Sequence, residues 1–183
     1  MKQILLGILI FTFAHSANAG VYCIDSNWNK LSTLFNESAR SYNRLVKEID
    51  EYEIKTKASA FIHNRYSLEE YSSMWNMNND VDRKSVEGFI ANTNKQIKRI
   101  EKFNTHLKII KKDGRNLEHN WEKLAEYCYD EDQYDNYKIA YKNYERSASN
   151  LKKTKELIES LKVTKAHYYT ELEFFVKTKE LSK

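Results

Sequence analysis

The side chains of this sequence best suited to chemistry are two cysteines and a run of tyrosines and carboxylates. The cysteines, Cys23 and Cys128, are the two that the sequence contains. An even cysteine count in an exported chain favours one disulfide, and the first residues, described below, indicate export. The pair is too widely spaced in sequence for a zinc knuckle. We therefore expect a Cys23–Cys128 disulfide.

Tyrosine is concentrated next to an acidic stretch. Six of the 13 tyrosines lie between residues 127 and 144, around Asp130, Glu131 and Asp132. We favour the interpretation that Tyr134, Tyr137, Tyr141 and Tyr144 fill a helical seam, with their hydroxyls reaching water. The alternative is a recognition surface, because tyrosine supplies rigid amphipathic contact area. The residues of that candidate surface are Tyr127, Tyr129, Tyr134, Tyr137, Asp130 and Asp132.

A local excess of positive charge lies between residues 95 and 112. Its candidate contact residues are Lys95, Lys98, Arg99 and Lys102. The simpler interpretation is a solvated helix face, and the alternative is a contact surface for anionic lipid, peptidoglycan or an acidic partner. The net charge of the whole chain is +4, a weak charge for a nucleic-acid-binding protein.

The sequence offers no recognised catalytic or metal-binding motif. The histidines beyond residue 19 lack both the Glu-x-x-His spacing of di-iron bundles and the HExxH motif of zincins. The chain also lacks a GxSxG elbow, a P-loop and a dinucleotide fingerprint. His167 with Glu171, and His119 with Glu122, have the spacing of surface pairs on helices. We expect no enzymatic activity, no cofactor and no metal.

The first nineteen residues have the pattern of a secretory signal peptide. Lys2 precedes an apolar stretch over residues 4–14, and Ala-Asn-Ala at 17–19 gives the small-x-small pattern before a cleavage point between Ala19 and Gly20. The apolar stretch is too short to span a bilayer comfortably, and no stop-transfer segment follows it. We expect a bacterial protein of the periplasm or the secreted fraction, with no membrane span after processing and with residues 20–183 as a single domain.

The elements that position these side chains are long helices. The sequence contains no proline and four glycines, which is too few for many turns. Apolar residues recur in steps of three and four from Ile24 to Tyr52, from Val86 to Cys128 and from Tyr134 to Phe175, a pattern typical of coiled coils. Turns are expected near 77–80 and 129–132, and the acidic run at 130–132 should then lie in the first turn of the third helix, where the helix dipole favours it.

Short connections make neighbouring helices antiparallel. The sequence therefore predicts an all-α fold, an elongated up-down-up antiparallel three-helix bundle or coiled coil in which Cys23 and Cys128 meet at one end. The first helix is either continuous or broken near 57–67, where its seam loses large residues and Ser67 to Glu70 match an S-x-x-E capping box. Gly114 lies in the second seam, where we expect a continuous helix with close packing.

These features predict an exported, non-enzymatic coiled-coil protein that binds another envelope or secreted protein. It could act as a secretion-system accessory, an inhibitor or exclusion factor, or a chaperone, and a homo-oligomer stays open. The expected architecture resembles the minor pilus-tip subunits of type IV secretion systems, which are exported and built on long helical bundles. A small cell-wall-active enzyme or its regulator is the remaining alternative, and would need two carboxylates across a cleft.

Overall fold

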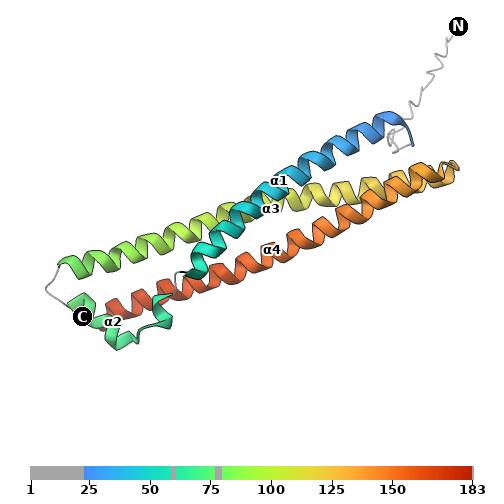
Figure 1. Ribbon diagram of the computed structural model, residues 1–183. Helices are drawn as coiled ribbons and strands as arrows, with labels where there is room; N and C mark the ends of the chain where they lie inside the picture. Colours follow the sequence, from blue (N-terminus) through green and yellow to red (C-terminus); the bar gives the residue numbers. More distant parts are fainter. Residues whose placement is uncertain (1–22, 59–60, 77–79, 183) are drawn as a thin grey trace, which may run out of the picture.

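The computed structural model describes residues 23–58, 61–76 and 80–182, and this part of the chain is helical without strands (Figure 1). The predicted signal peptide at 1–19, its cleavage point and the expected turn at 77–79 lie outside the described residues. The elements are α1 (Asp25–Ala58), the 3-10 helix η1 (Ile62–Asn64), α2 (Leu68–Asn76), α3 (Asp80–Asp130) and α4 (Tyr134–Leu181). The all-α prediction is confirmed. None of the described helices is long and apolar enough to cross a membrane.

Helices α3 and α4 form a long antiparallel hairpin that is the body of the molecule (Figure 1). They contain 51 and 48 residues, and at 1.5 Å per residue each is about 75 Å long. Helix α1 runs antiparallel to α3 and crosses it at a shallow angle, while α2 packs against the far end of α4 and α3. The up-down-up order predicted from the sequence is therefore present.

The core consists of three clusters along the length of the hairpin. Near the α3–α4 turn it contains Trp121 and Leu124, in the middle Ile100 and Leu161, and near the other end Phe175. Every seam position expected in the second helix, from Val86 to Cys128, is buried or partly buried. The sequence therefore predicted the register of α3 correctly.

The expected register is correct only in part at the start of α4, where Tyr137 and Tyr144 pack against the core. Tyr134 and Tyr141 are 50% and 44% exposed, whereas Ala140 and Ser147 are buried. Ala140 belongs to the core cluster that contains the fully buried Trp121. The buried face of α4 here therefore contains Ala140 and Ser147 with the partly buried Tyr137 and Tyr144, while Tyr134 and Tyr141 lie outside it.

The turn between α3 and α4 ends α3 with a Schellman motif. Gln133 N donates to Cys128 O at 2.8 Å and Asp132 N donates to Tyr129 O at 3.1 Å, the paired bonds of that motif. Asp132 has the left-handed conformation, with φ 57°. Because α3 continues through Asp130, the expected placement of Asp130 to Asp132 in the first turn of the next helix is wrong, and the acidic residue in that turn is Asp135.

The first of the three predicted helices is broken, which is one of the two alternatives that the sequence allowed. Helix α1 ends at Ala58, and α2 begins after a reciprocal capping box. Glu70 N donates to Ser67 Oγ at 3.1 Å, and Ser67 N donates to Glu70 Oε2 at 2.8 Å. The rings of Tyr66 and Tyr71, at the staple positions on either side of this cap, lie 5.8 Å apart.

Helix α3 continues through Gly114, as expected, but the packing there does not require glycine. A Cβ atom at Gly114 would lie 3.6 Å from Leu151 Cδ1, an ordinary van der Waals distance. Gly114 thus packs beside Leu151, but this contact leaves room for a Cβ atom.

Candidate functional site

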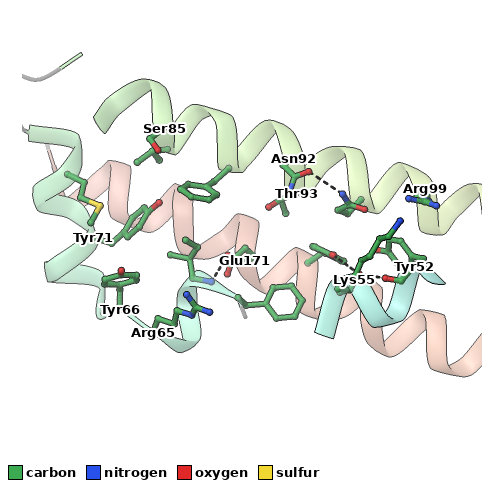
Figure 2. A pocket seen from close by; sticks show the side chains of 18 residues that line it. Tyr52, Lys55, Arg65, Tyr66, Tyr71, Ser85, Asn92, Thr93, Arg99 and Glu171 are labelled. Carbon is green, nitrogen blue, oxygen red and sulfur yellow. Dashed lines mark hydrogen bonds between the residues drawn. The ribbon is translucent and has the colours of Figure 1, made fainter. Parts of the chain in front are cut away.

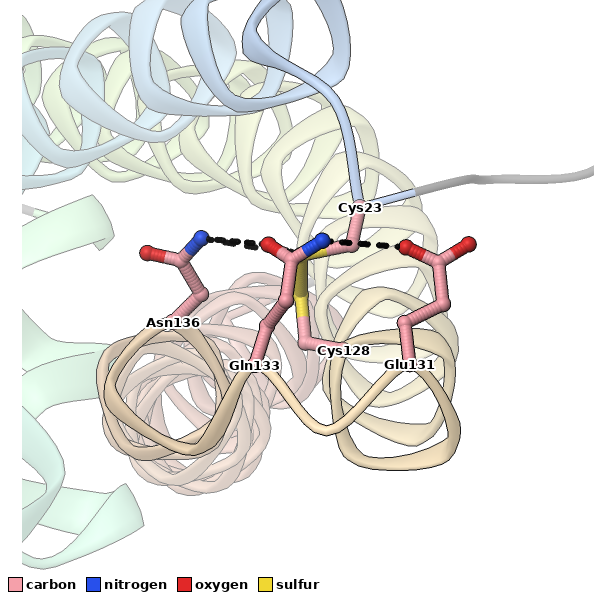
Figure 3. The surroundings of a disulfide bond; sticks show 5 residues. All are labelled: Cys23, Cys128, Glu131, Gln133 and Asn136. Carbon is pink, nitrogen blue, oxygen red and sulfur yellow. Dashed lines mark hydrogen bonds between the residues drawn. A yellow bond between two sulfur atoms is a disulfide. The ribbon is translucent and has the colours of Figure 1, made fainter.

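The predicted disulfide is present at the turn end of the hairpin (Figure 3). Cys23 and Cys128 are 105 residues apart in sequence, and their Cα atoms are 5.0 Å apart. Both are buried, and Gln133 covers them with its carbonyl oxygen 3.1 Å from Cys23 Sγ. Asn136 Nδ2 donates to that oxygen at 2.8 Å, and Gln133 Nε2 donates to Glu131 Oε2 at 3.1 Å. The disulfide and this network fix the start of α1 to the α3–α4 turn.

Five tyrosines form a continuous ladder of rings beside the disulfide. We call Tyr129, Tyr134, Tyr137, Tyr141 and Tyr144 the tyrosine cluster. Tyr129 contacts Tyr134 and Tyr137 with ring centroids 5.8 and 5.4 Å apart. The ladder continues from Tyr137 to Tyr141 at 5.9 Å and from Tyr141 to Tyr144 at 5.7 Å. Three of the five rings, Tyr129, Tyr134 and Tyr141, are 44–53% exposed, so the expected seam role is wrong for Tyr134 and Tyr141. Tyr137 and Tyr144 are partly buried and pack against the core cluster of Trp121, as expected.

A groove of about 520 Å³ runs between α3 and α4 beside the tyrosine cluster. One side is formed by the cluster and the other by α3, which contributes the carboxylates of Glu122, Glu126 and Asp130. We call this feature the acidic groove. The Glu122 charge raises the pKa of Tyr144, and the hydrogen bond from the Tyr134 hydroxyl to Asp132, 3.0 Å long, raises the pKa of Tyr134. Both shifts reflect a negative electrostatic environment.

The structure brings most of the candidate recognition residues together, with two differences. Tyr129, Tyr134, Tyr137, Asp130 and Asp132 lie at this one end, whereas Tyr127 is partly buried and does not line the groove. The sequence analysis did not include Tyr141, Tyr144, Glu122 or Glu126 in the recognition surface, although all four line the groove; for the two glutamates a signal was available. Their positions relative to Asp130, at steps of four on one helix, were the available signal.

The basic residues predicted on the second helix do not share one environment. Lys95, Lys98 and Lys102 are exposed on α3 at helical spacing. The Arg99 guanidinium lies instead over the rings of Tyr52 and Phe103, 5.2 and 5.5 Å from their centroids. Arg99 therefore packs against α1, while the three lysines form a solvated face.

Glu171 of α4 is a buried carboxylate whose role the sequence did not indicate. It is 4% exposed, and its two oxygens accept hydrogen bonds from Ile62 N at 2.7 Å and His63 N at 3.1 Å. The ring Nδ1 of His63 lies 2.5 Å from Glu171 Oε2. Glu171 thus holds the segment after the α1 break against α4.

The expected surface pair of Glu171 with His167 is wrong. The ring of His167 stacks on Phe61 with centroids 5.7 Å apart, and Glu171 pairs with His63 across the fold. The other expected pair is present on the surface, with His119 Nδ1 4.0 Å from Glu122 Oε2. In the part of the chain that the structure describes, no group of three or more His, Cys, Asp or Glu side chains is arranged to hold a metal ion.

Comparison with known proteins adds no relative. No family model matches the chain, and no curated protein or solved structure matches it significantly.

Proposed function

We propose that this is an exported, non-enzymatic helical protein that binds another envelope or secreted protein through the tyrosine cluster and the acidic groove. The observation that carries the proposal is the exposure of a contiguous row of aromatic rings at one end of the molecule. Tyr129, Tyr134 and Tyr141 are each 44–53% exposed and contact other rings of the cluster. Contiguous exposed aromatic surface of this kind marks interaction sites.

The charge of the acidic groove indicates the chemistry of the partner. Glu122, Glu126 and Asp130 line it together with the tyrosine rings, and Lys123, which bonds Glu126 at 2.6 Å, offsets one of these charges. A partner segment with an arginine or lysine could pair with the carboxylates and also lie over a ring face. We expect a basic side chain flanked by apolar ones at the centre of the contact.

The surroundings of the cluster support binding at low entropic cost. The disulfide, the Schellman turn and the Gln133 network constrain the end of the bundle from which the cluster projects. A site that is already ordered loses less conformational freedom when a partner binds. Tyrosine adds to this advantage because its side chain has few rotatable bonds.

A disulfide fits an oxidising compartment, and together with the predicted signal peptide it supports a periplasmic or secreted location. Within that setting the protein could be a secretion-system accessory, an inhibitor or exclusion factor, or a chaperone. A subunit similar to the type IV minor pilus-tip proteins is an alternative that the helical architecture allows. The solvated lysine face of α3 is a second candidate contact for an anionic partner.

No particular observation favours the cell-wall hydrolase alternative over binding. Such an enzyme needs two carboxylates that face each other across the scissile bond. The three carboxylates that line the acidic groove all come from one helix, α3.

Site-specific photocrosslinking in the producing cells tests the proposal. Benzoylphenylalanine replaces Tyr134 or Tyr141, and as a control it replaces Val163, which is 60% exposed on α4 away from the groove. We expect one covalent adduct of defined mass from the two cluster positions and none from Val163. Reversing charge with Glu126→Lys and Asp130→Lys should lower the yield about fivefold. Equal yields at all three positions, or no adduct at the cluster, would contradict the proposal.

A further inference from the structure

A second cavity, of about 560 Å³, lies near the break between α1 and α2, in the half of the molecule away from the disulfide (Figure 2). Helix α1 ends at Ala58, and η1 is held against α4 by Glu171. Helix α3 is therefore only partly covered between Ser85 and Arg99, which both line the cavity. At 1.5 Å per residue this stretch is about 21 Å long.

The floor of the cavity contains a buried hydroxyl group without a partner. Tyr71 is 2% exposed and lines the cavity, and its hydroxyl makes no hydrogen bond to any described residue. Burial, followed by the negative charge of Glu171, raises the pKa of Tyr71 to about 12, so the hydroxyl keeps its proton at neutral pH. A buried polar group of this kind is normally satisfied by a solvent molecule or a ligand.

The charged side chains around the cavity are mainly positive. Arg65 and Arg99 line it, and neither forms an ion pair with a described carboxylate. The carboxylate that lines the cavity is Glu171, whose oxygens already accept hydrogen bonds from the backbone of η1. The cavity therefore offers donors to an anion.

Aromatic rings stand at the rim beside these positive charges. Phe89 and Tyr66 are 44% and 41% exposed, although both are large apolar side chains that line the cavity. Helix α3, which carries Phe89, also contributes polar groups to the wall, with Gln96 Nε2 bonded to Asn92 Oδ1 at 3.1 Å. Rings, amides and arginine in one concave site are typical of small-molecule binding sites.

We propose that this cavity binds a small organic anion that carries a flat ring. Arg65 binds the anionic group, because guanidinium presents several donors to a carboxylate or a similar anion. Phe89 and Tyr66 pack against the ring, and the Tyr71 hydroxyl donates to an oxygen atom of the ligand. The site is separate from the tyrosine cluster, so it stands independently of the proposed protein partner.

Two fluorescent probes that share a ring system test the proposal on the disulfide-bonded protein. The anion 8-anilinonaphthalene-1-sulfonate should bind and become fluorescent, while the uncharged N-phenyl-1-naphthylamine should bind about tenfold more weakly. The acidic groove should not bind the anionic probe, because its carboxylates repel the sulfonate. Equal affinity for the two probes would show an unselective apolar cavity and would overturn the proposal.

Substitutions locate the probe. Arg65→Gln should weaken binding of the sulfonate probe about fivefold to tenfold, whereas Arg146→Gln, at an exposed arginine of α4 outside the cavity, should leave it unchanged. Asn92→Trp, at an exposed position on the cavity wall, should fill the cavity and abolish binding while circular dichroism stays unchanged. If both Arg65→Gln and Asn92→Trp bind the probe as the parent protein does, the proposal is wrong.

Discussion

The Glu171 carboxylate should be one of the largest single contributors to the stability of the segment between α1 and α2. Its side chain is 4% exposed and accepts hydrogen bonds from Ile62 N and His63 N, with the His63 ring against the same oxygen. Glu171→Ala removes all three contacts at once. The backbone N–H groups of Ile62 and His63 then stay partly buried without this hydrogen-bond acceptor, because alanine has no polar side-chain atom.

The magnitude follows from these contacts. Each partly buried N–H group that loses its acceptor costs about 1–1.5 kcal/mol, and the His63 contact adds about 0.5–1 kcal/mol. Glu171→Ala should therefore lower the free energy of unfolding by about 2.5–4 kcal/mol. Glu171→Gln keeps one acceptor oxygen and should cost about half as much, about 1–2 kcal/mol. These losses are a large part of the 5–15 kcal/mol typical of a whole domain.

Urea unfolding followed by circular dichroism at 222 nm measures this effect, and proteolysis reports it locally. With a typical slope the alanine variant should lose about 1–2 M in its urea midpoint, and trypsin should cut after Arg65 faster than in the parent protein. Glu173→Ala, at an exposed glutamate two residues away on α4, is the matched control and should change stability by less than about 0.5 kcal/mol. If Glu171→Ala unfolds like Glu173→Ala, the inferred role of this carboxylate is wrong.

Four further outcomes follow from the structure. Reduction of the Cys23–Cys128 bond, which closes a loop of 105 residues, should lower the free energy of unfolding by about 4–5 kcal/mol in the chain-entropy model, measured by urea unfolding with and without reductant; an unchanged midpoint would contradict it. Gly114→Ala should stabilise by about 0.5–1 kcal/mol, because its Cβ meets Leu151 at an ordinary contact distance, and a fall in melting temperature would show that the helices are closer than described. Asp132→Gly should stabilise by about 0.5–1 kcal/mol by relieving the positive φ, and a loss of stability would mean that the turn has another conformation. Because the folded state raises the pKa of Tyr71 to about 12 while the unfolded value is about 10, stability should hold up to about pH 10 and fall between pH 10 and 12; absorbance at 295 nm should show late ionisation in the parent protein that Tyr71→Phe removes, and an identical titration of both would refute it.

The helices and their partners were predictable because the pattern of large apolar residues decides them. Val86, Ile100, Leu107 and Leu124 recur at helical spacing and are all buried in α3. The disulfide followed from the same reasoning, since matched antiparallel arms place Cys23 and Cys128 at one end. The capping box at Ser67 marked the start of α2. The sequence alone did not decide whether the first predicted helix is continuous or broken.

The surface character of the tyrosine cluster could not be read from spacing. Tyr134, Tyr137, Tyr141 and Tyr144 repeat as a seam would, yet Tyr137 and Tyr144 pack against the core while Tyr134 and Tyr141 are exposed and Ala140 is buried. Which positions of α4 are buried depends on the side chains that pack against them from the other helices. A pattern of hydrophobicity in one segment does not contain that information.

The role of Glu171 was hidden for a similar reason. Its partners, Ile62 N and His63 N, are more than 100 residues away in sequence and belong to a segment without regular periodicity. Local spacing pointed instead to His167, one turn away on the same helix. The cavity lined by Arg65 and Tyr71 likewise depends on where the chain crosses after α1 ends, which local sequence signals do not specify.

Nitration of tyrosines by tetranitromethane, read by mass spectrometry, tests most directly whether the tyrosine cluster is a surface that a partner covers. In the purified protein Tyr129, Tyr134 and Tyr141 should react readily, as should Tyr169, a 45% exposed residue outside the cluster, while the buried Tyr52 and Tyr71 should not. In intact producing cells the three cluster residues should become protected while Tyr169 still reacts. Equal reaction of the cluster and Tyr169 in both preparations would contradict the account.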